Sequence, residues 1–330
     1  MAVTIAEINK LRHLTSAGMM DCKKALTEAN GDMDAAVEIL RKKGQAVAAK
    51  REDRQAAEGC VLAKNDGNFV AMLALCCETD FVAKNQGFVA LTQAILDAAV
   101  AARAKNLDEV KALTVNGMAV ADLITDESGK TGEKIELGRY EYLEAPSTTY
   151  YVHFGNKLGT IVGFNLADVD AEVARDVAMQ VASMNPVAVD RNAVPQATID
   201  TELSVAVEKT KEELVKKAVE AALKKAGLNP NHFDSADHIA SNVAKGWLTE
   251  EQAEQGRQII AETGAAKAAS LPEAMINNIA QGRLNKFFKE NCLMEQEYVK
   301  DGNLTIGQFL EQAQKGLVAV AFKRINLNQD

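Results

Sequence analysis

The stretch Glu78-Thr79-Asp80-Phe81 places an acid and a large aromatic side chain directly after an apolar run, residues 69–77. Asp80 could serve as a general base, because a positioned carboxylate can take a proton from a reacting group. Base catalysis needs a catalytic partner, and none lies beside Asp80 in the sequence. Phe81 offers different chemistry, since a polar turn gives an aromatic ring little to pack against in its own chain. We therefore interpret the turn as a binding element.

Motifs of common catalytic sites are missing from the sequence. It has no GxxxxGKS or GxGxxG phosphate loop, no HExxH metal pair and no Gly-x-Ser-x-Gly nucleophile turn. The four histidines are scattered, and His232 and His238 are expected on a polar surface loop. We therefore expect no enzyme activity, no metal and no cofactor. A hydrolase that uses Asp80 is the alternative, without a supporting motif.

Composition places the chain among ordinary globular proteins. Its 330 residues are 47% hydrophobic and 25% charged, which suits two or three domains. No apolar run approaches the roughly 20 residues that span a bilayer, and the first residues lack the pattern of a secretory signal. The cysteines are odd in number and show no CxxC spacing, which favours free, buried thiols in a reducing compartment. We expect a cytoplasmic protein without membrane contact.

Net charge argues against a dedicated nucleic-acid-binding protein. The chain has a formal charge of −9, whereas binding to phosphates needs clustered Lys and Arg. Residues 41–54 form one basic run, in which six cations are opposed only by Glu52 and Asp53. We favour a solvated linker helix, and a tRNA-binding adaptor that uses this run is the alternative.

Residues 1 to about 44 have the pattern of three short helices. A capping box precedes the first helix, and the third is predicted to end at Gly44, before a short linker. Met19 and Met20 follow the first loop, where flexible thioethers suit an adaptable contact surface; burial in the core of the module is an equal alternative. We assign residues 1–54 to this module and its linker. An adaptor for ubiquitin-type partners is a further alternative.

The next part of the chain shows one pattern twice. Residues 59–77 contain two apolar runs around a turn, as in a β-hairpin, and an amphipathic helix follows. Residues 148–186 repeat the order of strand, Gly-Asn turn, strand and helix. We interpret this as an internal duplication, with an antiparallel sheet covered by helices in each half, so the predicted fold class is α+β. The halves are assigned to residues 55–146 and to residues 147–199 with 276–330.

Residues 200–275 differ in composition from both halves. They begin with a long, charged, Ala-rich helical stretch, and two more helical stretches follow. This order is typical of a helical hairpin or coiled-coil arm that projects from a compact core.

Several segments resemble the bacterial elongation factor Ts family. Residues 15–44 resemble its first module, and ETDFVAKNQGF, residues 78–88, resembles its most distinctive core motif. The segments VHFGNKLGTIVG, VAMQVASMNP and AQGRLNKFF resemble its second core half and the residues after its coiled coil. The resemblance covers residues 1 to about 190 and 275–325, in family order.

Members of this family are guanine-nucleotide exchange factors for elongation factor Tu, the GTPase that delivers aminoacyl-tRNA to the ribosome. The resemblance implies a ubiquitin-associated-like three-helix module, a two-part α+β core and a protruding coiled coil. It implies displacement of Mg²⁺ and GDP from the GTPase, followed by GTP binding, without direct contact to nucleic acid. The resemblance is also compatible with a homodimer of this chain or a heterotetramer with elongation factor Tu. The arm is some tens of residues longer than in better-known members, and the chain ends without the extra carboxy-terminal helix of some members.

The resemblance also implies which residues contact the partner. The motif that acts on the Mg²⁺ site of the GTPase domain matches Thr79, Asp80, Phe81 and Val82. Contacts of the first module with the same domain match Arg12, Met19 and Met20. Contacts of the second core half with the third domain of the partner match Gly132, His153 and Val299. The alignment near His153 needs a shift of one residue.

Overall fold

The computed structural model describes residues 3–15 and 17–328. The chain divides into two compact units, one made of the residues up to 189 with those from 296 onward, the other of residues 190–295. Helices and small antiparallel sheets occur together, which confirms the α+β class. In the described residues, no helix is both long enough and apolar enough to cross a membrane.

The first three helices are α1 (Ile5–Thr15), α2 (Met19–Glu28) and α3 (Met33–Lys50). They pack around a small core that includes Leu11, Cys22, Leu26 and Ala36. The predicted end of the third helix at Gly44 is wrong, because α3 continues to Lys50. Residues 45–50, Gln-Ala-Val-Ala-Ala-Lys, are good helix formers, and Gly44 is buried within the helix rather than at its end.

The first half of the core contains one three-stranded sheet and the helices on one of its faces. The strands are β1 (Glu58–Asp66), β2 (Phe69–Cys77) and β5 (Glu136–Glu144), antiparallel in the order β1-β2-β5. Between β2 and β5 come α4 (Asp80–Ala83), α5 (Gln86–Ala101), α6 (Leu107–Ala112), β3 (Thr114–Val115), β4 (Met118–Ala119) and α7 (Val120–Thr131).

The second half repeats this topology. Its strands are β6 (Ser147–Val152), β7 (Leu158–Phe164) and β10 (Ala319–Asn326), antiparallel in the order β6-β7-β10. The elements between β7 and β10 include α8 (Ala171–Met184), β8 (Glu297–Tyr298), β9 (Asp301–Thr305) and α13 (Ile306–Ala313). In each half the last strand pairs with the second strand of the hairpin, which agrees with the predicted duplication. We propose that this unit consists of three domains: residues 1–54, residues 55–146 and the second half of the core.

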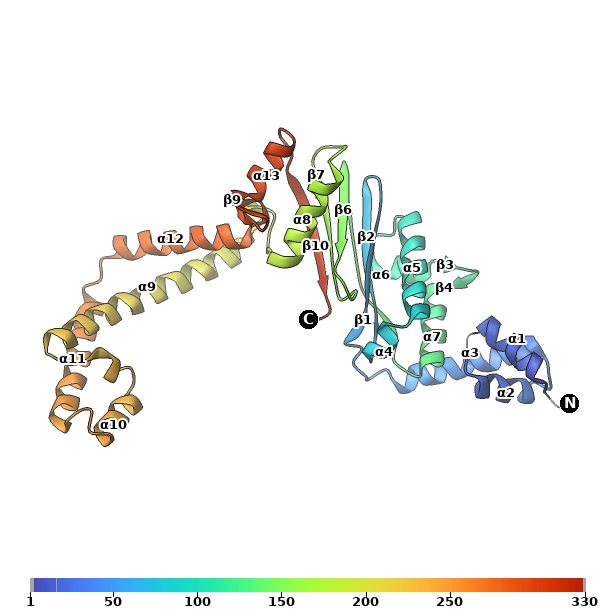
Figure 1. The fold of residues 1–330 in the computed structure, drawn as a ribbon, viewed down its shortest axis with the longest axis horizontal. Coiled ribbons are helices and arrows are strands. Elements are labelled where there is room, and N and C mark those ends of the chain that lie inside the picture. The colour runs from blue at the N-terminus through green and yellow to red at the C-terminus, as the bar shows by residue number, and fades with distance from the viewer. Residues whose placement is uncertain (1–2, 16, 329–330) are drawn as a thin grey trace. The chain divides into compact units, whose positions relative to one another are not determined.

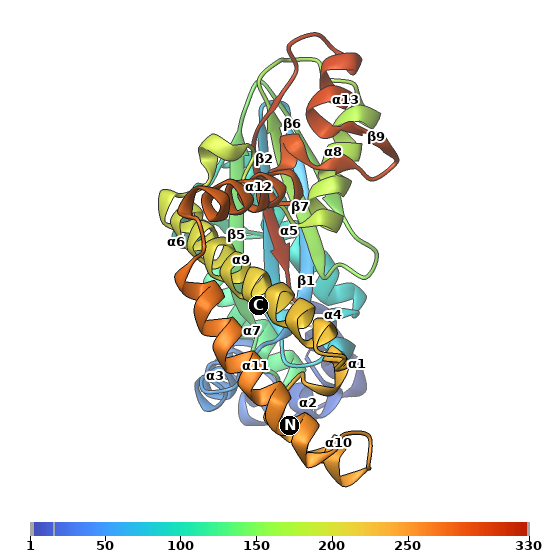
Figure 2. The same ribbon diagram turned by 90° about the vertical axis from the view of Figure 1, so that its left-hand side faces the viewer.

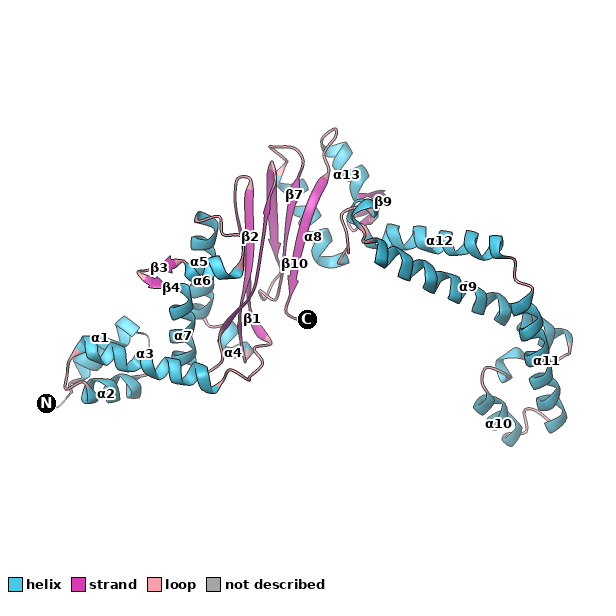
Figure 3. Ribbon diagram, turned by 180° about the vertical axis from the view of Figure 1, so that it is seen from behind, coloured by secondary structure: helices cyan, strands magenta, loops and turns pink. Residues whose placement is uncertain are grey.

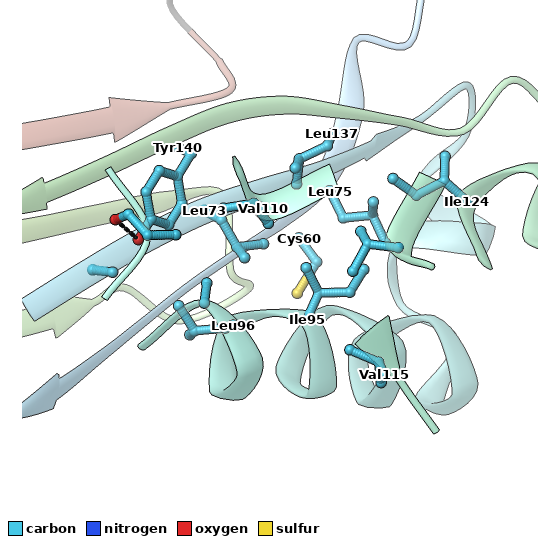
Figure 4. Packing of buried hydrophobic residues seen from close by; sticks show 14 of the residues in the cluster. Cys60, Leu73, Leu75, Ile95, Leu96, Val110, Val115, Ile124, Leu137 and Tyr140 are labelled. Carbon is cyan, nitrogen blue, oxygen red and sulfur yellow. Dashed lines mark hydrogen bonds between the residues drawn. The ribbon is translucent and has the colours of Figure 1, made fainter. Parts of the chain in front are cut away.

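Strand β2 is buried along its whole length because both faces of the first sheet are covered. Successive side chains of a strand point to opposite faces. Leu73 and Leu75 face the helices, together with Cys60, Ile95 and other residues of one apolar cluster (Figure 4). Met72 and Ala74 face the second sheet, in a separate cluster with residues of β7 and β10. The core is therefore two sheets packed face to face with helices outside each (Figures 1 and 3).

The second unit is helical and elongated. It consists of α9 (Gln196–Lys225), α10 (Ala236–Ala244), α11 (Glu250–Ala269) and α12 (Glu273–Asn291), with 3-10 turns at Arg191–Ala193, Pro230–His232 and Leu293–Glu295. Helix α9 packs beside both α11 and α12 (Figure 2). The predicted arm boundaries at residues 200 and 275 fall inside α9 and α12, because neither helix is interrupted there.

Candidate functional site

The segment after β2 exposes the ring of Phe81 more than the residues on either side of it. Thr79 is the N-cap of α4, and its hydroxyl accepts a hydrogen bond from the amide of Val82 at 3.5 Å. Ala83 is buried and Val82 packs partly against the core. Phe81, which directly precedes Val82, is 84% exposed. A ring sealed inside its own chain is therefore excluded.

A carboxylate from a distant segment holds this turn. The Glu133 side chain accepts hydrogen bonds from the amides of Glu78 and Thr79 at 3.1 and 3.0 Å, and from the Thr79 hydroxyl at 2.6 Å. Bonds to a charged acceptor are stronger than those between neutral groups. No sequence signal pointed to Glu133, because 54 residues separate it from Thr79.

The Glu78 carboxylate makes the reciprocal contact. It accepts a hydrogen bond from the amide of Lys134 at 2.6 Å and from the guanidinium of Arg51 at 2.8 Å. These donors favour the charged form, so the backbone bond from Lys134 and then Arg51 hold the pKa of Glu78 below its ordinary value of 4.5. The Glu133 side chain and the Lys134 amide thus fix the backbone just before Phe81. Helix α4, which contains Phe81, lies beside β1 (Figure 1).

Asp80 points into solvent next to Phe81. Its carboxylate pairs with Lys84 at 2.6 Å, and that hydrogen bond lowers the pKa of Asp80. An exposed pair of this kind adds little to stability. Asp80 is therefore a surface anion with a partner that a stronger donor can replace. In the described residues, no group of three or more His, Cys, Asp or Glu side chains could hold a metal ion.

The cysteines are free and buried, as expected. Burial raises the pKa of Cys77 to about 12, so its thiol keeps its proton and donates to the carbonyl oxygen of Thr79 at 3.2 Å. Burial likewise raises the pKa of Cys60 to about 11. These thiols support the structure and are not nucleophiles.

Gly132 lies in the first half of the core, whereas its predicted partner contact was grouped with those of the second half. It is the C-cap of α7, with a left-handed backbone at φ 72°. That conformation suits glycine, and it ends the helix just before Glu133. Gly132 therefore helps to direct Glu133 toward Thr79.

The first module exposes a small apolar surface. Met19 and Met20 are 51% and 63% exposed, and Leu14 is also exposed. Arg12 lies exposed on α1, two residues before Leu14. Burial of the two methionines in the core of the module is thereby excluded, so their side chains are available to a partner.

The basic run is not simply solvated. Arg41 pairs with Asp122 of α7 at 2.8 Å, and Lys43 pairs with Asp21 of α2 at 2.5 Å. With the Arg51–Glu78 pair, three of the six cations are engaged within the chain. The run therefore fastens the module to its surroundings, which disfavours a tRNA-binding role.

Sequence reasoning missed Phe154, the most exposed large apolar side chain of the described residues at 98%. It follows His153, which is also exposed and shares a hydrogen bond with the Tyr151 hydroxyl at 2.8 Å. The signal was available, because Phe154 is an aromatic residue in a polar turn, as Phe81 is. His153 alone was selected from this turn.

The turn between β6 and β7 lies against the first residues of β1. The amide of Val61 donates to the carbonyl oxygen of Asn156 at 2.7 Å, and Lys157 pairs with Glu58 at 2.6 Å. Glu58 itself pairs in the sheet with Cys77, two residues before Thr79. The two turns that carry Phe81 and Phe154 therefore flank the same end of β1.

Val299 lies in the turn between β8 and β9 and is 51% exposed. Its amide donates to the side chain of Gln180 on α8 at 3.0 Å. The three residues predicted to contact the third domain of the partner thus come from three separate places: the end of α7, the β6–β7 turn and the β8–β9 turn.

Comparison with known proteins agrees with this arrangement. A family profile described as Elongation factor TS matches residues 78–329. The chain is 59% identical to Elongation factor Ts of Phocaeicola vulgatus, 56% identical to that of Bacteroides thetaiotaomicron and 46% identical to that of Porphyromonas gingivalis. Each alignment covers 100% of this chain and 100% of the relative, so it includes the long helical unit. This chain therefore belongs to the elongation factor Ts family of translation elongation factors.

Proposed function

We propose that this chain is a guanine-nucleotide exchange factor that acts on elongation factor Tu in the cytoplasm. The observation that carries the proposal is the exposed ring of Phe81 on a backbone held by Glu133 and Glu78. A ring that is both exposed and fixed loses little conformational freedom when a partner covers it. It is therefore suited to enter an apolar gap in another protein.

Phe81 supplies binding energy and Asp80 supplies direction. A phenylalanine side chain offers about 150 Å² or more of surface, worth about 2–3 kcal/mol when a partner buries it. Asp80 already pairs with Lys84 in the free protein, and a donor on the GTPase can take its place. In this proposal Thr79 and Val82 fix the backbone, whereas Asp80 and Phe81 make the contacts.

Exchange follows from unequal binding to two states of the GTPase. Bound GDP is held by backbone amides, a lysine and Mg²⁺ of the partner. Insertion of Phe81 favours the state in which the Mg²⁺ ligands have moved away, and the phosphates then lose their main counter-charge. A ten-thousand-fold faster release requires that state to be favoured by about 5.5 kcal/mol. Nucleotide binding must expel the factor by the same coupling energy.

The other exposed residues extend this contact. We propose that Arg12, Met19 and Met20 bind the GTPase domain, and that Gly132, His153 and Val299 bind the third domain of the partner. The mechanism needs no covalent step by this chain and no cofactor, so we propose no enzyme activity. A homodimer, or a heterotetramer with elongation factor Tu, stays part of the proposal.

The test measures release of a fluorescent GDP analogue from elongation factor Tu of the same organism. The unmodified chain should accelerate release, and Phe81→Ala should reduce the acceleration by about 30- to 150-fold, the equivalent of the lost burial. Trp247→Ala is the matched control, because Trp247 is 60% exposed but lies in the helical unit. An unchanged rate for a folded Phe81→Ala variant would contradict the proposal.

A further inference from the structure

Helix α3 connects the first module to the core, and contacts hold it along its length. Its 18 residues, at about 1.5 Å each, span about 27 Å. The helix lies beside α7 (Figure 1). Its amino-terminal part belongs to the module that exposes Met19 and Met20, and its carboxy-terminal end approaches the segment before Phe81.

In its middle, α3 meets α7 backbone to backbone. A Cβ atom added to Gly129 would lie 2.5 Å from the Cα of Gly44, closer than real Cβ contacts. A Cβ atom added to Gly44 would lie 3.2 Å from the carbonyl oxygen of Thr125, which demands only a small displacement. This close approach therefore requires a glycine at position 129 and favours one at position 44. The Arg41–Asp122 pair joins the same two helices.

Polar contacts hold α3 at its middle and at its end. Beside Gly44, Lys43 pairs with Asp21 of α2 at 2.5 Å. At its end, Arg51 pairs with Glu78, and the Lys134 ammonium donates to two carbonyl oxygens of the residues after α3 at 3.0 Å each. Glu78 is the residue that precedes the N-cap of α4. Contacts therefore run without interruption from the module to the backbone that presents Phe81.

The joint between module and core is not a continuous apolar interface. A cavity of about 340 Å³ lies there, lined by residues that include Leu14, Leu40, Met118 and Leu123. Beside this cavity, the packing of α3 against α7 joins the two parts. The Gly44–Gly129 approach and the Arg41–Asp122 pair belong to that joint.

We propose that α3 is a rigid spacer that holds the Met19–Met20 surface at a fixed position relative to Phe81. This inference rests on the proposed exchange function, and it adds that the two contacts reach the partner as one preorganised surface. Two linked contacts bind far better when their spacing already matches the partner, because the second contact needs no further search. A loose tether between them would forfeit that advantage.

Three glycine substitutions give a graded test. Gly129→Ala must force the helices apart, Gly44→Ala should have a smaller effect, and Gly282→Ala in α12 is the control because its Cβ would meet nothing within 4 Å. Backbone amide relaxation in the free protein is the first readout. The module should tumble together with the core in the unmodified chain and the control, and separately in Gly129→Ala. Trypsin should then cut within residues 41–54 faster in Gly129→Ala than in the control.

Exchange kinetics give the second readout. Gly129→Ala should raise the factor concentration needed for half-maximal exchange by about tenfold. Met20→Ala should weaken the unmodified chain but cost little more in the Gly129→Ala background, whereas Phe81→Ala should keep its full effect in both. If Gly129→Ala does not fold, Arg41→Glu should replace it, with rescue by the charge swap Arg41→Glu with Asp122→Arg.

The outcomes separate the spacer from the proposed function. Independent tumbling of the module in the unmodified chain would overturn the spacer, whatever the exchange rate. An equal cost of Met20→Ala in both backgrounds would overturn it as well. Joint tumbling without any acceleration of GDP release would instead refute the exchange function and leave α3 as a structural strut only.

Discussion

Phe81 and Phe154 occupy the two halves of a duplicated core, yet their backbones are held in different ways. Phe81 lies in a short helix, α4, and the side chains of Glu133 and Glu78 fix the residues before it to a loop far away in sequence. Phe154 lies in a hairpin turn that is held by backbone bonds, among them Val61 to Asn156, and by the Lys157–Glu58 ion pair. Duplication thus reproduced the sheets, while each half acquired its own means of exposing an aromatic ring.

The difference predicts that the first turn depends on charged side chains more than the second turn does. Both turns flank the start of β1. Side-chain carboxylates can be removed by substitution or by protonation, whereas backbone bonds of a hairpin resist both. The following experiments, from the largest expected effect to the smallest, test this contrast.

Glu133→Ala should have the largest effect. It removes the acceptor for two backbone amides and one hydroxyl, so the free energy of unfolding should fall by about 1–3 kcal/mol. The displaced Phe81 should then lower the rate of GDP release by at least about tenfold, although the ring itself is still present. Urea unfolding and nucleotide-release assays measure the two effects. Glu212→Gln, at an exposed position of α9, is the control and should change neither.

Phe154→Ala should come next, with a weaker complex and an intact fold. Loss of a ring that the partner buries costs about 2 kcal/mol of binding free energy, or about 30-fold in affinity. The cost should add to that of Phe81→Ala, because the two rings lie in separate turns. Calorimetric titration with nucleotide-free elongation factor Tu provides the affinities. Unchanged affinity would confine the partner surface to the first half.

A pH titration should loosen the first turn and spare the second. The pKa of Glu78 is lower in the folded chain than its ordinary value of 4.5, so its bonds stabilise the turn above that pH. This stabilisation should disappear as the pH falls through the lowered value. Between about pH 6 and about pH 3, the Lys134 amide should lose protection from hydrogen exchange, while the Val61 amide keeps it. Equal loss at both amides would contradict the contrast.

Thiol alkylation at neutral pH should have no effect on the folded chain, which makes it the last test in this order. Burial raises the pKa of Cys77 to about 12 and that of Cys60 to about 11, and both side chains are inaccessible. Cys60 lies below the second turn, where the Asn156 amide group contacts its sulfur at 3.7 Å. Iodoacetamide should therefore modify neither residue in the folded chain and both after unfolding, as mass spectrometry can show. Rapid modification of Cys77 alone would indicate that the first turn opens.

Local patterns were sufficient to predict much of the fold. Strand alternation and turn residues located both hairpins, and their repetition revealed the duplicated halves. The end of α3 was misplaced, because a glycine usually marks a helix end and only the backbone of Gly129 explains why Gly44 lies inside a helix. The predicted arm boundaries at residues 200 and 275 fall inside α9 and α12, since neither helix has a break in sequence there.

The candidate site likewise combines features that local sequence predicts with features that depend on contacts between distant residues. Phe81 could be selected from sequence because an aromatic residue in a polar turn has no burial available nearby. The same argument applies to Phe154, but only His153 was selected from that turn. Glu133 was not selected, because its role depends on contact with Thr79 across 54 residues.

The sequence by itself determined the elements, the duplication and the exposed ring of Phe81, because helix and strand periods and turn chemistry act over a few residues. Only the tertiary structure decided which carboxylate fixes the backbone beside that ring and which ion pairs fasten α3. It also decided that the turns of Phe81 and Phe154 both flank one end of β1. Those facts arise from contacts between residues far apart in the chain, and such contacts form only when the sheets pack and the helices settle on them.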